Sequence, residues 1–153
     1  MSEEFSQYRS RGIDIFTDRC GDITKDIKKL LKNKEKIKVL ELGPGYGKVL
    51  LELKQIFGDK IETYGITHQK EWSEKKIKKF ALANKMFSKA DVDNNIPQIY
   101  FQDLNYNLKL PSNKFDIIFS QSSFQHVSSK ALALEETHRL LTKDGIARIH
   151  LQP

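Results

Sequence analysis

The stretch VLELGPGYGKVL, residues 39–50, decides which kind of fold this chain adopts. It places Glu41 and three glycines between two apolar runs. The first run ends in Gly43, which predicts a buried strand, and the second continues at helical spacing to Gly58, which predicts a helix. Glycines between a strand and a helix let a ligand approach the backbone without meeting a Cβ, beside unpaired N–H groups. The stretch therefore predicts a strand–turn–helix unit that binds a ligand.

The rest of the chain repeats this alternation. Four further strands are predicted over 60–67, 98–104, 114–121 and 146–152. One helix is predicted to begin after the N-cap Asp22. Two more are predicted over 70–89 and 130–142, and Asp144-Gly145 is expected to end the last one. In the last helix, Leu134, Leu140 and Leu141 share a side, and Glu135 and Arg139 are spaced as an ion pair. Strands that alternate with helices predict an α/β fold, a doubly wound parallel sheet covered by helices on both faces.

Length and composition describe one globular domain. The chain has 153 residues, and residues 1–20 lack clear periodicity, so we expect an arm or short helix over 1–20 and a domain over 21–153. No run approaches the roughly 20 apolar residues of a membrane span. The polar N-terminus does not resemble a secretory signal, and the single Cys20 fits a reducing compartment. These features predict a cytoplasmic protein.

The net charge of +6 comes mainly from lysines clustered in 25–38 and 70–89. Such a charge fits a nucleic-acid surface, or simply solvated helix faces. The second interpretation is favoured, because the two runs lack the arginines or interleaved aromatic residues of a binding groove. Trp72 and Phe80 flank the lysines of the second run, and Phe80 is expected in the core.

The spacing of the glycines narrows the choice of ligand. A dinucleotide turn, G-x-G-x-x-G, would need a glycine at 48, where Lys48 stands, and the third glycine is Gly47. The G-K-[ST] of a phosphate-binding loop is also missing, because Val49 follows Lys48. The pattern E-x-G-x-G-x-G from Glu41 resembles motif I of the class I S-adenosylmethionine-dependent methyltransferases. The resemblance extends over about 22–151 and implies a five-stranded sheet in the order 3-2-1-4-5.

The resemblance also implies a set of cofactor-binding residues. Glu41 would pair with the ammonium group of the cofactor, and the turn would lie against it through Gly43, Pro44, Gly45, Tyr46 and Gly47. Thr67, His68 and Gln69 replace the usual acidic ribose ligand and the apolar residue beside the adenine. Asp103 and the Leu104 N–H would bind the adenine. Ser120 and Gln121 would lie near the methionine moiety.

Chemistry beyond binding rests on few residues. His126 is the candidate general base, and the alternative is that it only lines the pocket. Tyr8 and Phe16 could close over the cofactor, whereas Asp116 is expected to be structural. The histidines do not form a metal-ligand pattern, so no metal is predicted. The tetrapeptide [DNS]-P-P-[YFW] of adenine methyltransferases is absent, and SQSSF stands in its place.

Members of the family usually add a reversed hairpin after the fifth strand, and this chain stops at Pro153. We therefore expect a domain truncated after strand five, with the hairpin missing and an edge open to self-association. Two functions follow: methyl transfer to a small-molecule acceptor, or a catalytically silent binding module of the same fold. A nicotinamide-binding domain is a third, less favoured alternative.

Overall fold

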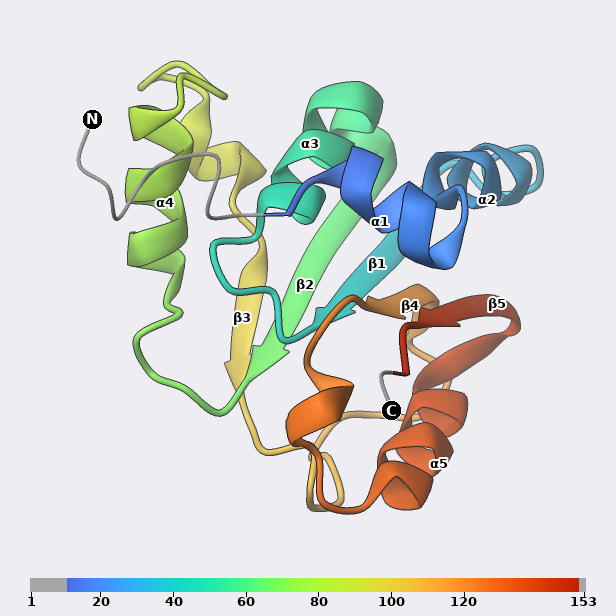
Figure 1. Cartoon of the computed structure of the whole chain (residues 1–153). Coiled ribbons are helices and arrows are strands. Elements are labelled where there is room, and N and C mark those ends of the chain that lie inside the picture. The colour runs from blue at the N-terminus through green and yellow to red at the C-terminus, as the bar shows by residue number, and fades with distance from the viewer. Residues whose placement is uncertain (1–10, 152–153) are drawn as a thin grey trace.

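A single parallel sheet organises the chain. The computed structural model describes residues 11–151 (Figure 1). The strands are β1 (Ile37–Leu42), β2 (Ile61–Thr67), β3 (Gln98–Phe101), β4 (Phe115–Ser120) and β5 (Leu141–Ile149). All pairs are parallel, and the order is β3-β2-β1-β4-β5. The predicted fold class and strand order are confirmed.

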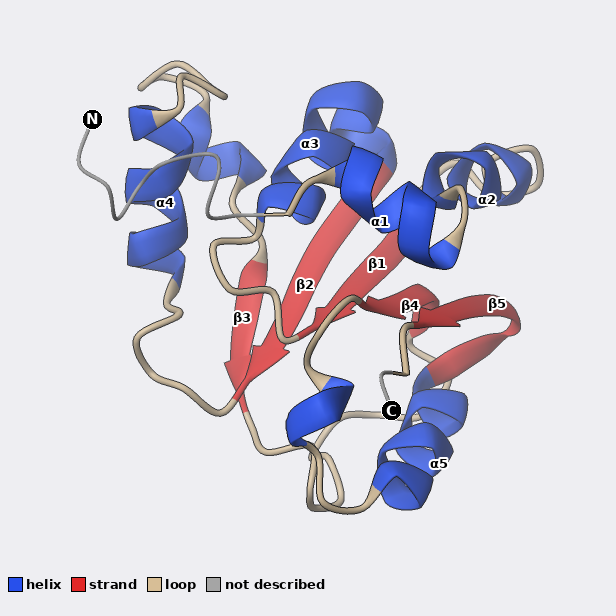
Figure 2. Cartoon of the chain, in the orientation of Figure 1, coloured by secondary structure: helices blue, strands red, loops and turns tan. Residues whose placement is uncertain are grey.

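Helices cover both faces of the sheet (Figure 2). They are α1 (Ile13–Cys20), α2 (Ile23–Leu30), α3 (Lys48–Phe57), α4 (Glu74–Ala83) and α5 (Lys130–Leu140). Short 3₁₀ turns are η3 (Gly58–Lys60), η4 (Val92–Asn95) and η5 (Phe124–His126). Ile37 and Val39 of β1 pack with α1, α2 and α3, while Leu40 and Leu42 pack on the face of α5. Because side chains alternate along a strand, β1 is apolar on both faces.

Side-chain caps fix where the helices start. Asp22 accepts a hydrogen bond from the Lys25 N–H, so the predicted N-cap of α2 is confirmed. Ser73 caps α4 in the same way, so that helix begins later than the predicted residue 70. Phe80 is fully buried, as predicted. The boundary between an arm over 1–20 and a domain over 21–153 stays a prediction.

The predicted boundary between the last helix and the last strand was wrong. Helix α5 ends at Leu140, and β5 begins at Leu141 rather than at 146. Phe115 pairs with Leu141 while Ile117 pairs with Ile146, so residues 142–145 form an irregularity within the strand. The Asp144-Gly145 pair lies in this irregularity and does not end the helix.

The predicted ion pair of α5 was also wrong by one residue. Arg139 pairs with Glu136, with 2.6 Å between Nη2 and Oε2, and not with Glu135. Its guanidinium also donates to the carbonyl oxygens of Leu108 and Leu110, which turn Arg139 toward the loop before β4. Leu134, predicted to share a side with Leu140 and Leu141, is 39% exposed, whereas Leu140 is fully buried.

Asp116 ties three strands together at the start of β4. Its carboxylate accepts hydrogen bonds from the Lys38 N–H at 2.8 Å and from Thr142 Oγ1 at 3.2 Å. Lys34 Nζ lies 2.5 Å from Oδ1. The predicted structural role of Asp116 is confirmed. Among residues 11–151, no helix is long and apolar enough to cross a membrane.

Candidate functional site

The glycine turn links β1 to α3 at the carboxyl end of the sheet. Gly43, Gly45 and Gly47 have φ values of +71°, +56° and +70°, in the left-handed region where a Cβ is unfavourable. The Gly43 N–H donates to the Ile66 carbonyl of β2 at 2.8 Å, and the Gly47 N–H donates to the Pro44 carbonyl at 2.8 Å. The turn is therefore fixed to β2 and closed on itself before α3 begins.

Close packing holds two sides of the turn and leaves its middle open. A Cβ on Gly43 would lie 2.5 Å from Ser123 Cβ, and a Cβ on Gly65 of β2 would lie 2.7 Å from Pro44 Cγ. Around Gly45, by contrast, a Cβ would meet no atom within 4 Å. The open position borders both cavities described next.

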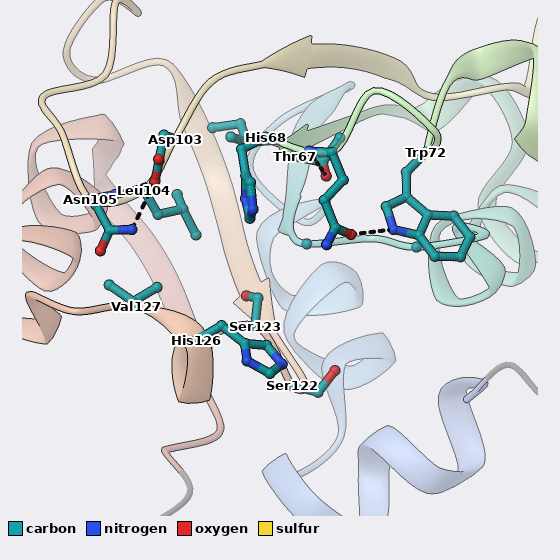
Figure 3. Close-up of a pocket in the computed structure, with 14 residues that line it drawn as sticks. Thr67, His68, Trp72, Asp103, Leu104, Asn105, Ser122, Ser123, His126 and Val127 are labelled. Atoms are coloured by element: carbon teal, nitrogen blue, oxygen red, sulfur yellow. Dashed lines mark hydrogen bonds between the residues drawn. The ribbon is translucent and has the colours of Figure 1, made fainter.

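Two adjoining cavities flank the turn. The large cavity, about 480 Å³, is lined by residues that follow β2, β3 and β4, namely Thr67–Gln69, Trp72, Asp103–Asn105, Ser122, Ser123, His126 and Val127 (Figure 3). The small cavity, about 320 Å³, is lined by Glu41, residues of the turn and of the start of α3, Arg11, Gln121 and Gln125. Gly43, Gly45, Trp72 and Ser122 line both. Most of the predicted site residues thus come together at one edge of the sheet.

The small cavity contains two buried side chains, each with one polar atom that has no hydrogen-bond partner within residues 11–151. Glu41 and Gln121 are each 5% exposed. Among the described residues, neither Glu41 Oε1 nor Gln121 Nε2 has a hydrogen-bond partner. Burial raises the pKa of Glu41 well above its usual value. Native proteins rarely leave such groups unpaired, so a polar or cationic group of a ligand is the expected partner.

Asp103 and Thr67 line the large cavity and also hold their own loops. Asp103 Oδ1 accepts hydrogen bonds from Asn105 N at 2.9 Å and Asn105 Nδ2 at 3.0 Å. Its other oxygen, Oδ2, has no partner within residues 11–151. Thr67 Oγ1 accepts from the Gln69 N–H at 3.2 Å, and Gln69 Oε1 accepts from Trp72 Nε1 at 2.6 Å. Leu104 completes this wall.

An aromatic group forms the side of the cavities next to α4. The Tyr46 ring stacks on Phe80 with a centroid distance of 4.9 Å and meets Trp72 edge to face at 4.9 Å. Lys76 Nζ lies 5.3 Å from the centre of the Trp72 ring. Because Phe80 is buried, it anchors Tyr46 and through it Trp72 at the cavity border.

His126 lies exposed at the large cavity, whereas Ser120 is fully buried. His126, in η5, is exposed and lines the large cavity, and Figure 3 shows its ring on the wall facing His68. Gln125 Nε2 lies 3.0 Å from His126 Nε2, and no carboxylate of the described residues pairs with this histidine. Ser120 is fully buried, and its hydroxyl donates to the Leu42 carbonyl at 3.1 Å. Ser120 lies under the turn and lines neither cavity.

Phe16 does not cover the cavities, contrary to the prediction. It is fully buried and packs edge to face on Phe119 of β4, with a centroid distance of 5.1 Å. It belongs to a core cluster against which Ile13 and Cys20 of the same helix also pack. Tyr8 lies outside the described residues. Within the described part of the chain, no cluster of three metal-ligating side chains exists.

Sequence reasoning missed several cavity residues, including Arg11, Trp72, Asn105 and Ser122. Ser122 lies within SQSSF, directly after a predicted strand, and this position was an available signal. Trp72 is the only tryptophan and follows the second strand, which was a weaker signal. Arg11 lies far from every motif in the sequence, and only the fold brings it to the cavity.

Comparison with known proteins identifies the family. A family model described as "Methyltransferase domain" matches residues 33–151. The chain belongs to the class I S-adenosylmethionine-dependent methyltransferase family. The predicted resemblance is confirmed, and S-adenosylmethionine is the cofactor of this family. No curated protein matches the chain.

Solved structures of the methyltransferase fold resemble the chain at low identity. A "SAM dependent methyltransferase from Aquifex aeolicus" is 24% identical with a TM-score of 0.59, and the match covers 88% of this chain and 65% of that one. PKMT2 from Rickettsia typhi, solved "in complex with AdoHcy", is 25% identical with a TM-score of 0.57, covering 75% and 21%. The "[4+2]-Cyclase SpnF" is 19% identical with a TM-score of 0.62, covering 90% and 42%. The matched part of this chain thus spans 65% or less of each of these structures.

The residues of this methyltransferase domain fit the family cofactor. An ammonium group would satisfy the unpaired Glu41 carboxylate, and a hydrogen-bond acceptor would satisfy the Gln121 amide. The open side of Gly45 leaves room for a ligand against the backbone. These observations concern the chain's own atoms and agree with the family assignment.

Proposed function

We propose that this chain binds S-adenosylmethionine across the two cavities and transfers its methyl group to a small-molecule acceptor. The observation that carries the proposal is a pair of buried polar atoms in the small cavity, Glu41 Oε1 and Gln121 Nε2, which have no hydrogen-bond partner in the described part of the chain. A buried carboxylate without a partner destabilises the fold, so its presence calls for a functional reason. An α-ammonium group that enters the small cavity supplies one.

The large cavity suits the nucleoside. Asp103 offers the free Oδ2 to an exocyclic amino group, and the Leu104 backbone offers an N–H to a ring nitrogen. Thr67 and Gln69 offer a hydroxyl and an amide to sugar hydroxyls in place of a carboxylate. Uncharged groups bind a diol less strongly than a carboxylate does, so we expect moderate affinity for the cofactor.

The cofactor, when bound, supplies a methyl group on a positively charged sulfur, already activated for in-line displacement. The protein's part is to position an acceptor and keep water away. His126 lies at the mouth of the large cavity, where it can accept a proton from an acceptor hydroxyl or simply form part of the wall.

A silent binding module, or another chemistry on the same fold, is the second candidate. The observation that favours it is the structural neighbour SpnF, which is named a cyclase although it has this fold. A shared fold does not determine the reaction, because function resides in the site. Cofactor binding is common to the first candidate and to many such modules, so turnover separates them.

Three further expectations belong to the same proposal. In the described residues, β5 pairs only with β4, so its other edge is open to a second copy of the chain. Nucleic acid is not favoured as a partner, because most of the lysines lie in the runs 25–38 and 70–89 rather than in the cleft. The single Cys20 favours the cytoplasm.

Isothermal titration calorimetry tests the proposal. We expect binding of S-adenosylmethionine, no comparable binding of NAD, and a loss of at least about tenfold in affinity for Asp103→Ala, which removes a charge-assisted hydrogen bond. Asp91→Ala is the matched control, because Asp91 also holds a local turn, by a 2.8 Å bond from Ser88, but lines neither cavity. No binding of S-adenosylmethionine at millimolar concentration would contradict the proposal.

A further inference from the structure

We propose that Arg11 binds the carboxylate of the ligand's amino-acid tail, and that Glu52 is the positioning residue that holds Arg11 at the small cavity. The inference rests on the proposed function, since it names the part of the tail that Glu41 does not bind. It concerns a segment outside the family match, which begins at residue 33. Neither the sequence motifs nor the comparisons point to Arg11.

The charges that line the small cavity match a zwitterion. Glu41 and Gln121 lie buried in its wall, and Arg11 lies exposed at its border. Within residues 11–151, the Arg11 guanidinium makes no hydrogen bond or ion pair. An amino-acid tail carries an ammonium and a carboxylate on one carbon, so it needs an anion and a cation in the same small space. Arginine suits the carboxylate best, because its planar fork can donate two parallel hydrogen bonds.

Glu52 of α3 fixes the backbone beside Arg11. The Ile13 N–H, at the start of α1, donates to Glu52 Oε1 at 3.1 Å. Gly12 is buried against this carboxylate, and a Cβ at Gly12 would overlap Glu52 Oε1. A side chain at position 12 would therefore push the Glu52 carboxylate away from the Ile13 N–H. Burial raises the pKa of Glu52, while the neighbouring Lys48 acts to lower it.

The rest of α1 is held at two more points. Phe16 packs on Phe119 in the core, as described above. At the other end of the helix, Arg148 Nη1 of β5 donates to the Cys20 carbonyl at 2.7 Å. A helix that is fixed at its start, middle and end cannot slide, and Arg11 lies two residues before it begins. The backbone at Arg11 is thus held beside the small cavity, which lowers the cost of binding.

Three ligands separate the role of Arg11 from general binding. S-adenosylhomocysteine carries both tail groups, its decarboxylated analogue keeps only the ammonium, and methylthioadenosine has no tail. By calorimetry, Arg11→Ala is expected to weaken binding of S-adenosylhomocysteine about tenfold, the loss of one charge-assisted contact at an exposed position. Binding of the other two ligands should stay within about twofold of the unaltered protein, because neither has a carboxylate for Arg11 to bind.

Two control variants also remove a positively charged side chain, but at other positions. Arg19→Ala removes another exposed arginine of the same segment, which lines neither cavity, and should leave all three affinities unchanged. Lys48→Ala removes the other cation of the small cavity. A selective loss of S-adenosylhomocysteine binding in Lys48→Ala but not in Arg11→Ala would overturn the assignment. Equal losses for all three ligands in Arg11→Ala would also overturn it, since they indicate a general structural role.

Glu52 is tested by rescue. Glu52→Ala should reproduce the selective loss of Arg11→Ala, and the double variant should lose no more than either single variant. Glu52→Gln keeps an oxygen that accepts from the Ile13 N–H and should restore binding. Failure of this rescue, or additive losses, would overturn the positioning role. If the unaltered protein binds none of the three ligands, the proposed function itself fails, whereas binding without tail selectivity overturns only the role of Arg11.

Discussion

At the end of β1, Glu41 holds a carboxylate oxygen in a buried position without a hydrogen-bond partner among the described residues. Its neighbours on the strand, Leu40 and Leu42, are fully or nearly fully buried. The charged form of Glu41 is therefore disfavoured in the ligand-free protein, and the cause is desolvation. A residue that weakens the fold at a cavity wall is typical of a site selected for binding rather than for stability.

Glu41→Gln should stabilise the protein at neutral and alkaline pH. The folded state raises the pKa of Glu41 above the ordinary value of 4.5, so the folded state binds the proton more tightly than the unfolded state. The unaltered protein therefore loses stability as the pH rises from the unfolded pKa to the folded one, and the glutamine variant does not. We expect a gain of at least about 1 kcal/mol at pH 8 that vanishes near pH 4.

Urea denaturation at both pH values measures this difference. Glu35→Gln, a change at an exposed position, is the control and should shift the free energy of unfolding little at either pH. A gain for Glu41→Gln that is the same at pH 4 and pH 8 would contradict the desolvation account, because it would not follow the ionisation of the carboxyl group.

At the scale of the element, the turn 43–47 is a rigid unit with one open side. Gly43 is blocked by Ser123, while a Cβ on Gly47 would only touch Ile77 at 3.5 Å. Gly45 alone of the three faces space, and it borders both cavities. A glycine is needed there for two separable reasons, which are the left-handed backbone and the room it leaves for a ligand.

Gly45→Ala and Gly58→Ala together separate these two reasons. Both glycines have φ of +56°, and at both a Cβ would meet no atom within 4 Å, but Gly58 ends α3 away from the cavities. Each variant should lose about 1–3 kcal/mol of stability, because a positive φ is unfavourable for a residue with a Cβ. Only Gly45→Ala should also weaken binding of S-adenosylhomocysteine, measured by calorimetry. Equal affinities in the two variants would mean that no ligand lies against Gly45.

Local chemistry made most elements predictable from the sequence. Asp22 is a capping residue at the start of a helical pattern, and the run before Gly43 is apolar on both faces, so neither needed knowledge of distant contacts. The turn was predictable because its three glycines satisfy a backbone requirement that few other residues meet. The resemblance to the methyltransferase family identified Glu41 and Gln121 as site residues, and both line the small cavity.

Long-range contacts explain the structural features that could not be predicted from the sequence. Arg139 turns to Glu136 because the loop carbonyls of Leu108 and Leu110 attract its guanidinium. Strand β5 starts early because Leu141 already pairs with Phe115. Arg11 reaches the small cavity because the nearby Ile13 N–H donates a hydrogen bond to Glu52, which lies 39 residues further along the chain. None of these pairings has a local signature.

At the scale of the whole molecule, the cleft exists only in the folded chain. Its walls come from the carboxyl ends of β1, β2, β3 and β4 and from Arg11. Glu41, Asp103 and Arg11 are far apart in sequence, so the unfolded chain has no comparable site. A ligand of this cleft therefore stabilises the fold by mass action.

Thermal unfolding with S-adenosylhomocysteine tests this linkage. At a ligand concentration of 100 times Kd, the added stability is about 2.7 kcal/mol, which corresponds to a rise in Tm of roughly 5 to 10 °C for a domain of this size.

Glu41→Gln and the unaltered protein should exchange their order of Tm when the ligand is added. Without ligand its Tm at pH 8 should exceed that of the unaltered protein, because the buried charge is gone. At the same total ligand concentration its Tm should rise less, because the glutamine amide pairs less strongly with an ammonium group than a carboxylate does. Equal ligand-induced rises in the two proteins would contradict a contact between Glu41 and the tail, even if both bind the nucleoside.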